Sequence, residues 1–430
     1  MERTQLRVVL VALGLLALAS ACDKVSSDNI QLWKTTQKGP DRLKAALADH
    51  GVEPRLRAEA AIAMTDIGLA DDVDTTFSSL PNDDRLAIAK SLESLYATQM
   101  KDPSADKALA ARDGLYSLRQ YVSPDEQAQI DAMLLPALEA DLSAGHLRQG
   151  RHSVDKMMTA IGPAAGDMLA RVLASPSSQV AQAAELLGKV GSPEAREKGG
   201  AAIVARAKTA NKKTPIEPLY KALGSVGGPS AVAFLESKVT GPDKDGAALA
   251  VRALQERRDP AVLPFALKVA GDAHADKIVR DEMFGVIETI GGLEARRGLL
   301  EIIANDKEEI VRYRAFESAL TSAKTEGIVP ALEAFPAAAT YKKVDVDDLL
   351  VKLIEKLGAA ARPALVQGLA SKSPLARMTC LMTLEQIGKA PDAPAVEKLA
   401  GDTASVKGFP AGETIGKEAK RIAGVLEKKT

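Results

Sequence analysis

The side chains that could do chemistry are few and widely scattered in this 430-residue sequence. Four histidines, His50, His146, His152 and His274, have none of the spacings of a metal site. No Gly-x-Ser-x-Gly, phosphate-binding or dinucleotide-binding glycine pattern occurs. We therefore expect no catalytic residue, no metal and no cofactor, and we expect the histidines to lie at the surface or in turns.

Two further groups of reactive side chains have simpler structural interpretations. Asp71-Asp72-Val-Asp74 and Asp345-Val-Asp347-Asp348 lack the length, glycine and closing glutamate of a calcium loop, and they are expected to be first-turn helix acids. Cys380 lies on the apolar face of a predicted helix, and no basic environment is evident around it. We therefore expect Cys380 to be a small core residue rather than a nucleophile.

Cys22 is the residue whose surroundings give it a defined chemistry. Arg3 and Arg7 precede an uncharged apolar run of 12 residues, Val8–Ala19. This run is shorter than the ~20 residues that span a bilayer and is typical of a signal-peptide core. Small residues up to Ala21 fit a cleavage site directly before the cysteine.

The segment Leu18-Ala19-Ser20-Ala21-Cys22 resembles the lipobox of bacterial lipoproteins, with Ala19 where leucine is usual. The resemblance implies cleavage before Cys22, a diacylglycerol on its thiol and an acylated amine. Residues 1–21 would be the signal peptide and 22–28 a lipidated tether. The protein would then be exported and anchored to a bacterial membrane, on its periplasmic or outer face. The alternative is ordinary secretion, with Cys22 incidental.

The composition favours helices and disfavours nucleic-acid binding. Hydrophobic residues make up 46% of the chain but aromatic residues only 3%, so the apolar residues are largely aliphatic. The net charge is −1, which gives no basic field for nucleic acid. One Trp, six Tyr and seven Phe also leave little to stack on bases.

Helical units with recognisable ends recur along the chain. In one unit Ser373 predicts an N-cap, Ala376, Cys380 and Leu384 share one face, and Gly388 follows where a left-handed C-terminal cap would lie. The same ending is predicted for the helices before Gly68 and Gly191. An apolar residue followed by glycine recurs at Gly68, Gly162, Gly191, Gly227, Gly291, Gly358 and Gly388.

These glycines indicate a repeat. Their shorter gaps are 29 to 36 residues, and the longer gaps fit two or three such units, which is typical of a solenoid. An arginine lies 11 residues before four of them, at Arg57, Arg151, Arg280 and Arg377. We interpret these arginines as structural residues that cross between adjacent repeats and pair with turn acids and carbonyls, rather than as a functional site.

The segment from Arg57 to Gly68 (RAEAAIAMTDIG) resembles the second helix of the HEAT repeat, especially the bacterial HEAT-like form also found in phycobilisome-lyase-type proteins. Residues 180–191 keep this pattern without the arginine. The segment Asp306–Arg312 resembles the acidic turn of another copy, with Asp306 and Glu309 as a capping box. Residues 70–145 lack the glycine pattern, although 106–120 and 125–142 still look helical.

We therefore predict an all-α fold, an α-solenoid in which antiparallel helix pairs stack as one right-handed superhelix over residues 29–430. The predicted function is a non-catalytic protein-interaction scaffold on the bacterial cell envelope. Its partners would be another envelope protein and the membrane, through the lipid, with no nucleic acid or metal. The alternatives are a HEAT-like lyase-type enzyme or ligand-handling protein, and a structural envelope component.

Overall fold

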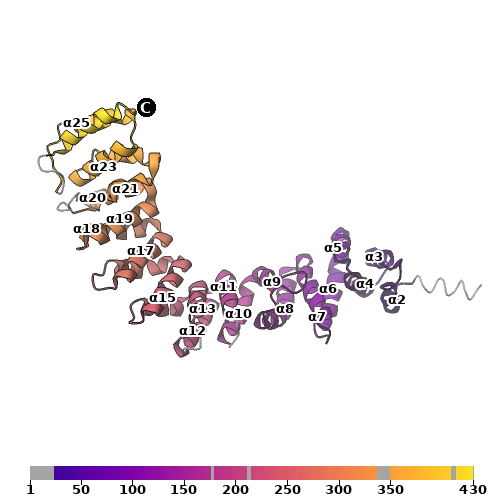
Figure 1. Ribbon diagram of the computed structural model, residues 1–430. Coiled ribbons are helices and arrows are strands. Elements are labelled where there is room, and N and C mark those ends of the chain that lie inside the picture. The colour runs from indigo at the N-terminus through magenta and orange to yellow at the C-terminus, as the bar shows by residue number, and fades with distance from the viewer. Residues whose placement is uncertain (1–23, 176–178, 211–214, 337–348, 408–412, 430) are drawn as a thin grey trace, which may run out of the picture. The chain divides into compact units, whose positions relative to one another are not determined.

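The computed structural model describes residues 24–175, 179–210, 215–336, 349–407 and 413–429, and every regular element in these ranges is a helix. Helices stack on one another within each of two successive parts of the chain (Figure 1), so the all-α solenoid prediction is confirmed. Among the described residues, no helix is both long and apolar enough to cross a membrane. Cys22 and the predicted signal peptide lie outside these ranges.

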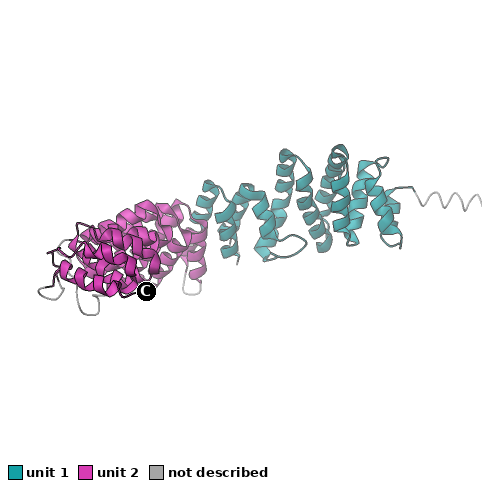
Figure 2. Ribbon diagram, turned by 90° about the horizontal axis from the view of Figure 1, so that it is seen from above, with its two compact units in different colours: residues 1–202 teal, residues 203–430 magenta. Residues whose placement is uncertain are grey.

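The chain divides into two compact units, residues 1–202 and 203–430 (Figure 2). The boundary falls within one helix, α12 (Pro193–Thr209). We describe each unit by itself, and a single continuous array over residues 29–430 stays a prediction.

Unit 1 contains the helices that precede this boundary. They are α2 (Ser27–Trp33), α3 (Gly39–Ala48), α4 (Pro54–Asp66), α5 (Ala70–Ser79), α6 (Asn82–Gln99), α7 (Ala105–Leu118), α8 (Pro124–Ala144), α9 (Val154–Ile161), α10 (Gly166–Ala174) and α11 (Val180–Val190). The helix α4 packs on α2, α3 and α6. From α6 to α9, however, each helix packs on the next one in sequence.

Unit 2 forms two rows of helices. Its elements are α13 (Glu217–Val226), α14 (Pro229–Val239), α15 (Lys244–Arg257), α16 (Leu263–Ala270), α17 (Lys277–Ile290), α18 (Gly292–Asn305), α19 (Glu309–Ala323), α20 (Ile328–Ala334), α21 (Leu349–Glu355), α22 (Arg362–Gly368), α23 (Pro374–Ile387), α24 (Ala393–Glu397) and α25 (Ile415–Leu426). The odd-numbered helices α13 to α25 pack in succession as one row, and α16, α18, α20 and α22 form the other. Alanine and aliphatic side chains fill the space between the rows.

The helix ends follow from local sequence. The hydroxyl of Ser373 accepts a hydrogen bond from the backbone N–H of Ala376 at 3.3 Å, and Pro374 opens α23. Ala376, Cys380 and Leu384 are all buried on the predicted face. The bounds of α23 and α11 are those that the sequence pattern predicts.

The first helix begins earlier than expected. Residues 22–28 were predicted to be a tether, but α2 starts at Ser27. Ser26 acts as its N-cap, because its hydroxyl accepts a hydrogen bond from the backbone N–H of Asn29 at 3.3 Å. Ile30 and Trp33 then bury the helix against the rest of unit 1.

Candidate functional site

Arg57 in unit 1 and Arg280 in unit 2 make similar contacts, each with a backbone carbonyl and with at least one carboxylate. The Nε–H of Arg57 donates to the carbonyl of Leu47 at 2.9 Å, and its Nη1 lies 3.1 Å from Asp84. The Nε–H of Arg280 donates to the carbonyl of Ala270 at 3.1 Å. Each arginine therefore reaches 10 residues back, to the end of the preceding helix. Hydrogen bonding by Arg57 lowers the pKa of Asp84 below its ordinary value.

The acids that pair with Arg280 come from the turn before α19. Its Nη2 lies 2.8 Å from Asp306 and its Nη1 lies 2.9 Å from Glu308. The side chains of Arg280 and Asp306 are each only 4% exposed, so this is a buried ion pair. The predicted capping box of Asp306 and Glu309 is wrong, because Asp306 gives its carboxylate to Arg280 and to the N–H of Glu308.

The other two predicted arginines differ from this pattern. Arg377 pairs with Asp402 at 2.7 Å and donates to the carbonyl of Ser371 at 2.8 Å. Arg151 departs further, because α9 begins only at Val154 and Arg151 precedes it. Its side chain reaches back to α5 instead of forward to a following repeat. The equal spacing to glycine therefore does not give Arg151 an equivalent place.

The predicted glycines fall into two structural classes. Gly68, Gly162 and Gly291 have φ of +85°, +71° and +64°, so they take the positive φ that favours glycine. Gly191 and Gly388 have φ of −69° and −71°, and the left-handed caps predicted there are wrong. A Cβ at either position would overlap the carbonyl oxygen of the last helical turn, at Leu187 or Leu384, so close approach favours glycine instead.

The remaining reactive side chains occupy separate places. Cys380 is fully buried, and this burial raises its pKa to about 12. His50 is exposed and pairs with Asp84. His152 lies in the turn before α9, and its pKa is lowered mainly because it is partly buried. The described residues contain no group of three or more His, Cys, Asp or Glu side chains that could hold a metal ion.

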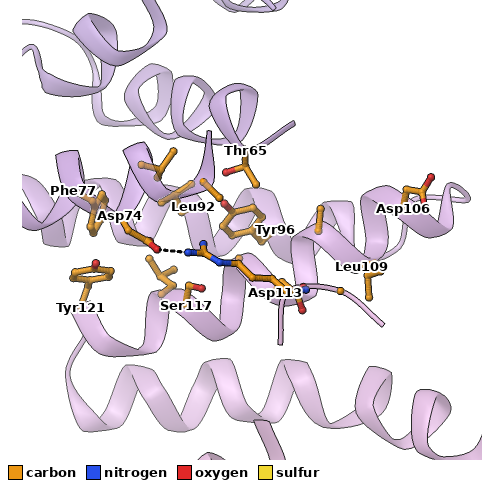
Figure 3. A pocket seen from close by; sticks show the side chains of 17 residues that line it. Thr65, Asp74, Phe77, Leu92, Tyr96, Asp106, Leu109, Asp113, Ser117 and Tyr121 are labelled. Atoms are coloured by element: carbon orange, nitrogen blue, oxygen red, sulfur yellow. Dashed lines mark hydrogen bonds and ion pairs between the residues drawn. The ribbon is translucent and has the colours of Figure 1, made fainter. Parts of the chain in front are cut away.

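A pocket of about 300 Å³ lies in unit 1, within the stretch that lacks the repeat pattern. The helices α5, α6 and α7 form its walls, with Thr65 of α4 and the segment before α9 at its edges (Figure 3). Its apolar lining is Ala70, Val73, Phe77, Leu92, Tyr96, Leu109, Ala110, Leu118 and Tyr121. Its polar and charged lining is Thr65, Asp74, Asp106, Asp113, Ser117 and Arg151.

Tyr96 and Gly114 form the inner wall together. The Tyr96 ring is buried, and burial raises the pKa of its hydroxyl to about 12, so the phenol stays neutral. A Cβ on Gly114 would overlap this ring. Glycine within a helix lowers its stability by ~0.5–1 kcal/mol relative to alanine. The packing of Tyr96 into the space beside Gly114 offsets this loss of helix stability in α7.

A buried charge network fixes the edge of the pocket. Arg112 is 2% exposed and pairs with Asp113 at 3.0 Å and with Asp141 of α8. Its Nη2 also donates to the carbonyl of Gln149 at 2.7 Å. The carboxylate of Asp113 accepts a hydrogen bond from the backbone N–H of Arg151. The segment before α9 is therefore tied to α7 at several points.

Arg151 closes one side of the pocket. Its Nη2 donates to Asp71 at 2.7 Å and to Asp74 at 3.0 Å, and both acids belong to α5. Asp71 and Asp72 lie in the first turn of α5, as predicted, but Asp74 lies beyond that turn, and the contact with Arg151 was not expected. Ser117 lies beside it and contacts Nε2 of His152 at 3.2 Å.

The pocket residues escaped the sequence reasoning because they share no motif. Asp74, Asp113 and Arg151 are brought together only by the packing of α5, α7 and the segment before α9. One signal was present: Phe77, Tyr96 and Tyr121 are three of the 14 aromatic residues of the chain, and all fall in the non-repeating stretch.

Comparison with known protein families finds a match that lies within unit 2. Residues 232–320 match the family described as HEAT repeats, and this segment runs from α14 into α19. The chain matches no curated protein. The matched residues include Arg280 and its partner acids.

Several solved structures are similar to the chain. Kap121p is 11% identical, with a TM-score of 0.40, over 89% of this chain and 45% of that one. Importin beta is 12% identical with a TM-score of 0.29, over 94% and 70%. UNC-45 from Drosophila melanogaster is 12% identical with a TM-score of 0.25, over 91% and 62%. The chain thus spans about half the length of Kap121p. The family match identifies residues 232–320 as HEAT repeats within an all-α solenoid chain.

Proposed function

We propose that this chain is a non-catalytic protein-interaction scaffold, exported and held at a bacterial membrane by a lipid on Cys22. Stacked helix pairs support the first part, because each repeat buries its core against its neighbours and leaves an extended row of helix surfaces for a partner. One feature of unit 2 indicates which residues would contact the partner.

That feature is a pair of exposed isoleucines in the HEAT-repeat segment. Ile278 and Ile310 are 68% and 62% exposed. Each is the second residue of its helix, α17 or α19, and these two helices pack side by side in one row. Burying an isoleucine side chain fully contributes ~1.5–3 kcal/mol, so a partner that covered both would gain binding free energy here.

A groove beside Ile278 extends this candidate partner-binding surface. It has a volume of about 500 Å³ and lies between α15 and α17, with Ala247, Ala248 and Val279 among its lining residues. Glu282 also lines it, and its Oε2 is buried without a hydrogen-bond partner among the described residues. Burial raises the pKa of Glu282. The groove thus offers apolar contact and one acceptor to a partner.

Copurification from the native envelope tests the scaffold. The Ile278→Asp, Ile310→Asp double variant should lose a defined partner that the unaltered chain retains, because charged side chains would replace the apolar contact. Leu32→Asp, at a 55% exposed apolar position of unit 1, is the matched control and should retain it. Equal recovery from both variants would place the partner elsewhere. Recovery of only further copies of the chain, or of glycan fragments, would favour the structural-component alternative.

The anchor has its own test. Mass spectrometry of the mature N-terminus should show Cys22 as the first residue, carrying acyl chains, and Cys22→Ser should release the protein from the membrane. Two or more acyl chains give stable anchoring because each buried CH₂ contributes ~0.8 kcal/mol. An unmodified Cys22 in a soluble, secreted chain would overturn this part of the proposal and leave the scaffold untouched.

The ligand-handling alternative is favoured by one observation, the pocket of unit 1. It contains an aromatic lining and several charged groups in one concave site, which is the usual form of a small-ligand site. Binding there is compatible with a scaffold, and its chemistry is considered next.

A further inference from the structure

The unit 1 pocket has a chemical character that stacking of helices does not require. We propose that it binds an alkyl chain that ends in an ammonium or guanidinium group. Free amines and the lysine or arginine side chains of a partner share this chemistry. The proposal stands independently of the scaffold and of the lipid anchor.

The apolar part of the ligand would lie against the inner wall. Leu92, Tyr96 and Leu118 are buried there, and Leu109 lies toward the end of the pocket that Asp106 borders (Figure 3). A volume of about 300 Å³ is at the lower end of the ~300–1,000 Å³ of ligand pockets, which suits a short chain better than a large ring system.

The charges at the pocket favour a cation over an anion. Three carboxylates border it, Asp74, Asp106 and Asp113, against the single guanidinium of Arg151. Asp113 pairs with Arg112, and Asp74 pairs with Arg151. Asp106, an exposed acid in the first turn of α7, makes no ion pair or hydrogen bond with its side chain among the described residues. A cationic ligand would give Asp106 a partner, whereas an anionic ligand would face it unpaired.

The contact of Arg151 shows which group this rim accepts. Arg151 is itself an alkyl chain ending in a guanidinium, it lines the pocket, and it pairs with Asp71 and Asp74. Its side chain is 40% exposed, so the contact lies at the mouth rather than in the core. Tyrosine and phenylalanine rings in the lining also attract cations through their faces.

Contacts within the chain hold the walls of the pocket in place. The buried Arg112 ties the segment before α9 to α7 and α8, and Gly114 leaves the space that Tyr96 fills. A site whose walls are fixed before binding loses less conformational entropy when the ligand enters.

Calorimetric titration of the full chain tests the charge preference with three probes of equal length. Hexylammonium should bind saturably at one site, hexanol at least ~10-fold more weakly, and hexanoate not at all. A tenfold difference corresponds to ~1.4 kcal/mol, and the ammonium reaches it only where the pocket walls shield its contact with Asp106 from water. Equal binding of hexylammonium and hexanol, or no binding of hexylammonium, would overturn the proposal.

Single substitutions test whether the cation binds in this pocket. Asp106→Asn should weaken hexylammonium binding several-fold, and Asp125→Asn, at an exposed first-turn acid of α8 outside the pocket, should not. Arg151→Ala should strengthen binding, because it removes the guanidinium that borders the pocket and leaves the charge of Asp74 uncompensated. Ala110→Phe should abolish binding by filling the pocket, with circular dichroism as the check on folding. Identical affinities for Asp106→Asn and Asp125→Asn would overturn the assignment.

Two further probes separate the sources of the cation. A blocked tripeptide, acetyl-Ala-Lys-Ala-amide, should bind at least as tightly as hexylammonium if the ligand is a partner's side chain. If the ligand is a free amine, hexylammonium should bind and the blocked peptide should not. Either result supports the shared chemistry, and failure of both overturns it without bearing on the copurification experiment.

Discussion

At the scale of single residues, the buried ion pair of Arg280 should dominate local stability. Replacing Arg280 with methionine leaves the carboxylate of Asp306 buried and without its charge partner. Removing one partner of a buried pair costs ~3–5 kcal/mol. We expect a loss of that size in the free energy of unfolding, measured by urea denaturation.

An exposed arginine of the neighbouring helix provides the control. Arg297 pairs with Glu294 at 3.2 Å, but both side chains are 70% exposed. Arg297→Met should change the unfolding free energy by less than ~0.5 kcal/mol, because solvent screens such a pair. Similar losses for Arg280→Met and Arg297→Met would show that the buried pair has no special weight.

Cys380 gives a second prediction at this scale. Its thiol is fully buried and has a pKa of about 12, so it should stay protonated and inaccessible at about pH 8. In the Cys22→Ser chain, a thiol reagent should label Cys380 only after denaturation. Rapid labelling of the folded chain would contradict its place in the core.

The arginines also show how far sequence reasoning reaches. A fixed distance to glycine located Arg57 and Arg280, whose carbonyl contacts lie 10 residues back in both. The same distance failed for Arg151, because Ser153 caps α9 and so places Arg151 before the helix. Its contacts with α5 span about 80 residues and leave no local signal.

At the scale of elements, two helical glycines should respond oppositely to the same substitution. Gly114→Ala should destabilise the chain by ~1–3 kcal/mol, because the new methyl group overlaps the Tyr96 ring. Gly424, within α25, has open space at its Cβ position. Gly424→Ala should stabilise by ~0.5–1 kcal/mol through helix propensity. Thermal or urea unfolding of the two variants measures both signs, and stabilisation by both would contradict the packing at Tyr96.

The contact between α23 and α25 should be sensitive to acid. Arg421 contacts both carboxylate oxygens of Glu385, at 2.5 and 2.8 Å, and these hydrogen bonds lower the pKa of Glu385 below its ordinary 4.5. A lowered pKa stabilises the folded state above 4.5, and this stabilisation is lost as the pH falls below it.

Comparison with the Glu385→Gln variant isolates the contribution of this ion pair to the free energy of unfolding. The unaltered chain should unfold with a larger free energy than the variant at about pH 7, and the difference should shrink as the pH falls below the ordinary glutamate pKa. In an Arg421→Met background the substitution should have little effect at either pH. A difference that stays constant with pH would contradict the role of the pair.

Helix bounds were the most predictable part of these elements. The N-cap of Ser373 and the apolar face through Cys380 define α23 from local sequence alone. The φ values of Gly191 and Gly388 were not predictable, because both a left-handed cap and a close carbonyl place glycine after a helix. The pocket was least predictable, since its lining comes from several helices that share no pattern.

At the scale of the whole molecule, we assign different functions to the repeats and to the pocket. The HEAT-repeat segment of unit 2 presents Ile278 and Ile310 from neighbouring helices, and the non-repeating stretch of unit 1 forms the pocket. The regular part of the chain was predictable because every helix-pair repeat buries its apolar faces in the same way. The surface a partner uses depends on which apolar residues are left exposed, and only the packed structure shows that.

Site-specific photocrosslinking in native cells tests the central claim most directly. A photoreactive residue at position 278 or 310 should form a covalent adduct with the same single envelope protein. The same residue at position 301, an exposed site on α18 in the other row, should not. Adducts of one shared mass from 278 and 310 are the predicted result. Equal crosslinking from all three positions, or none from 278 and 310, would contradict the scaffold.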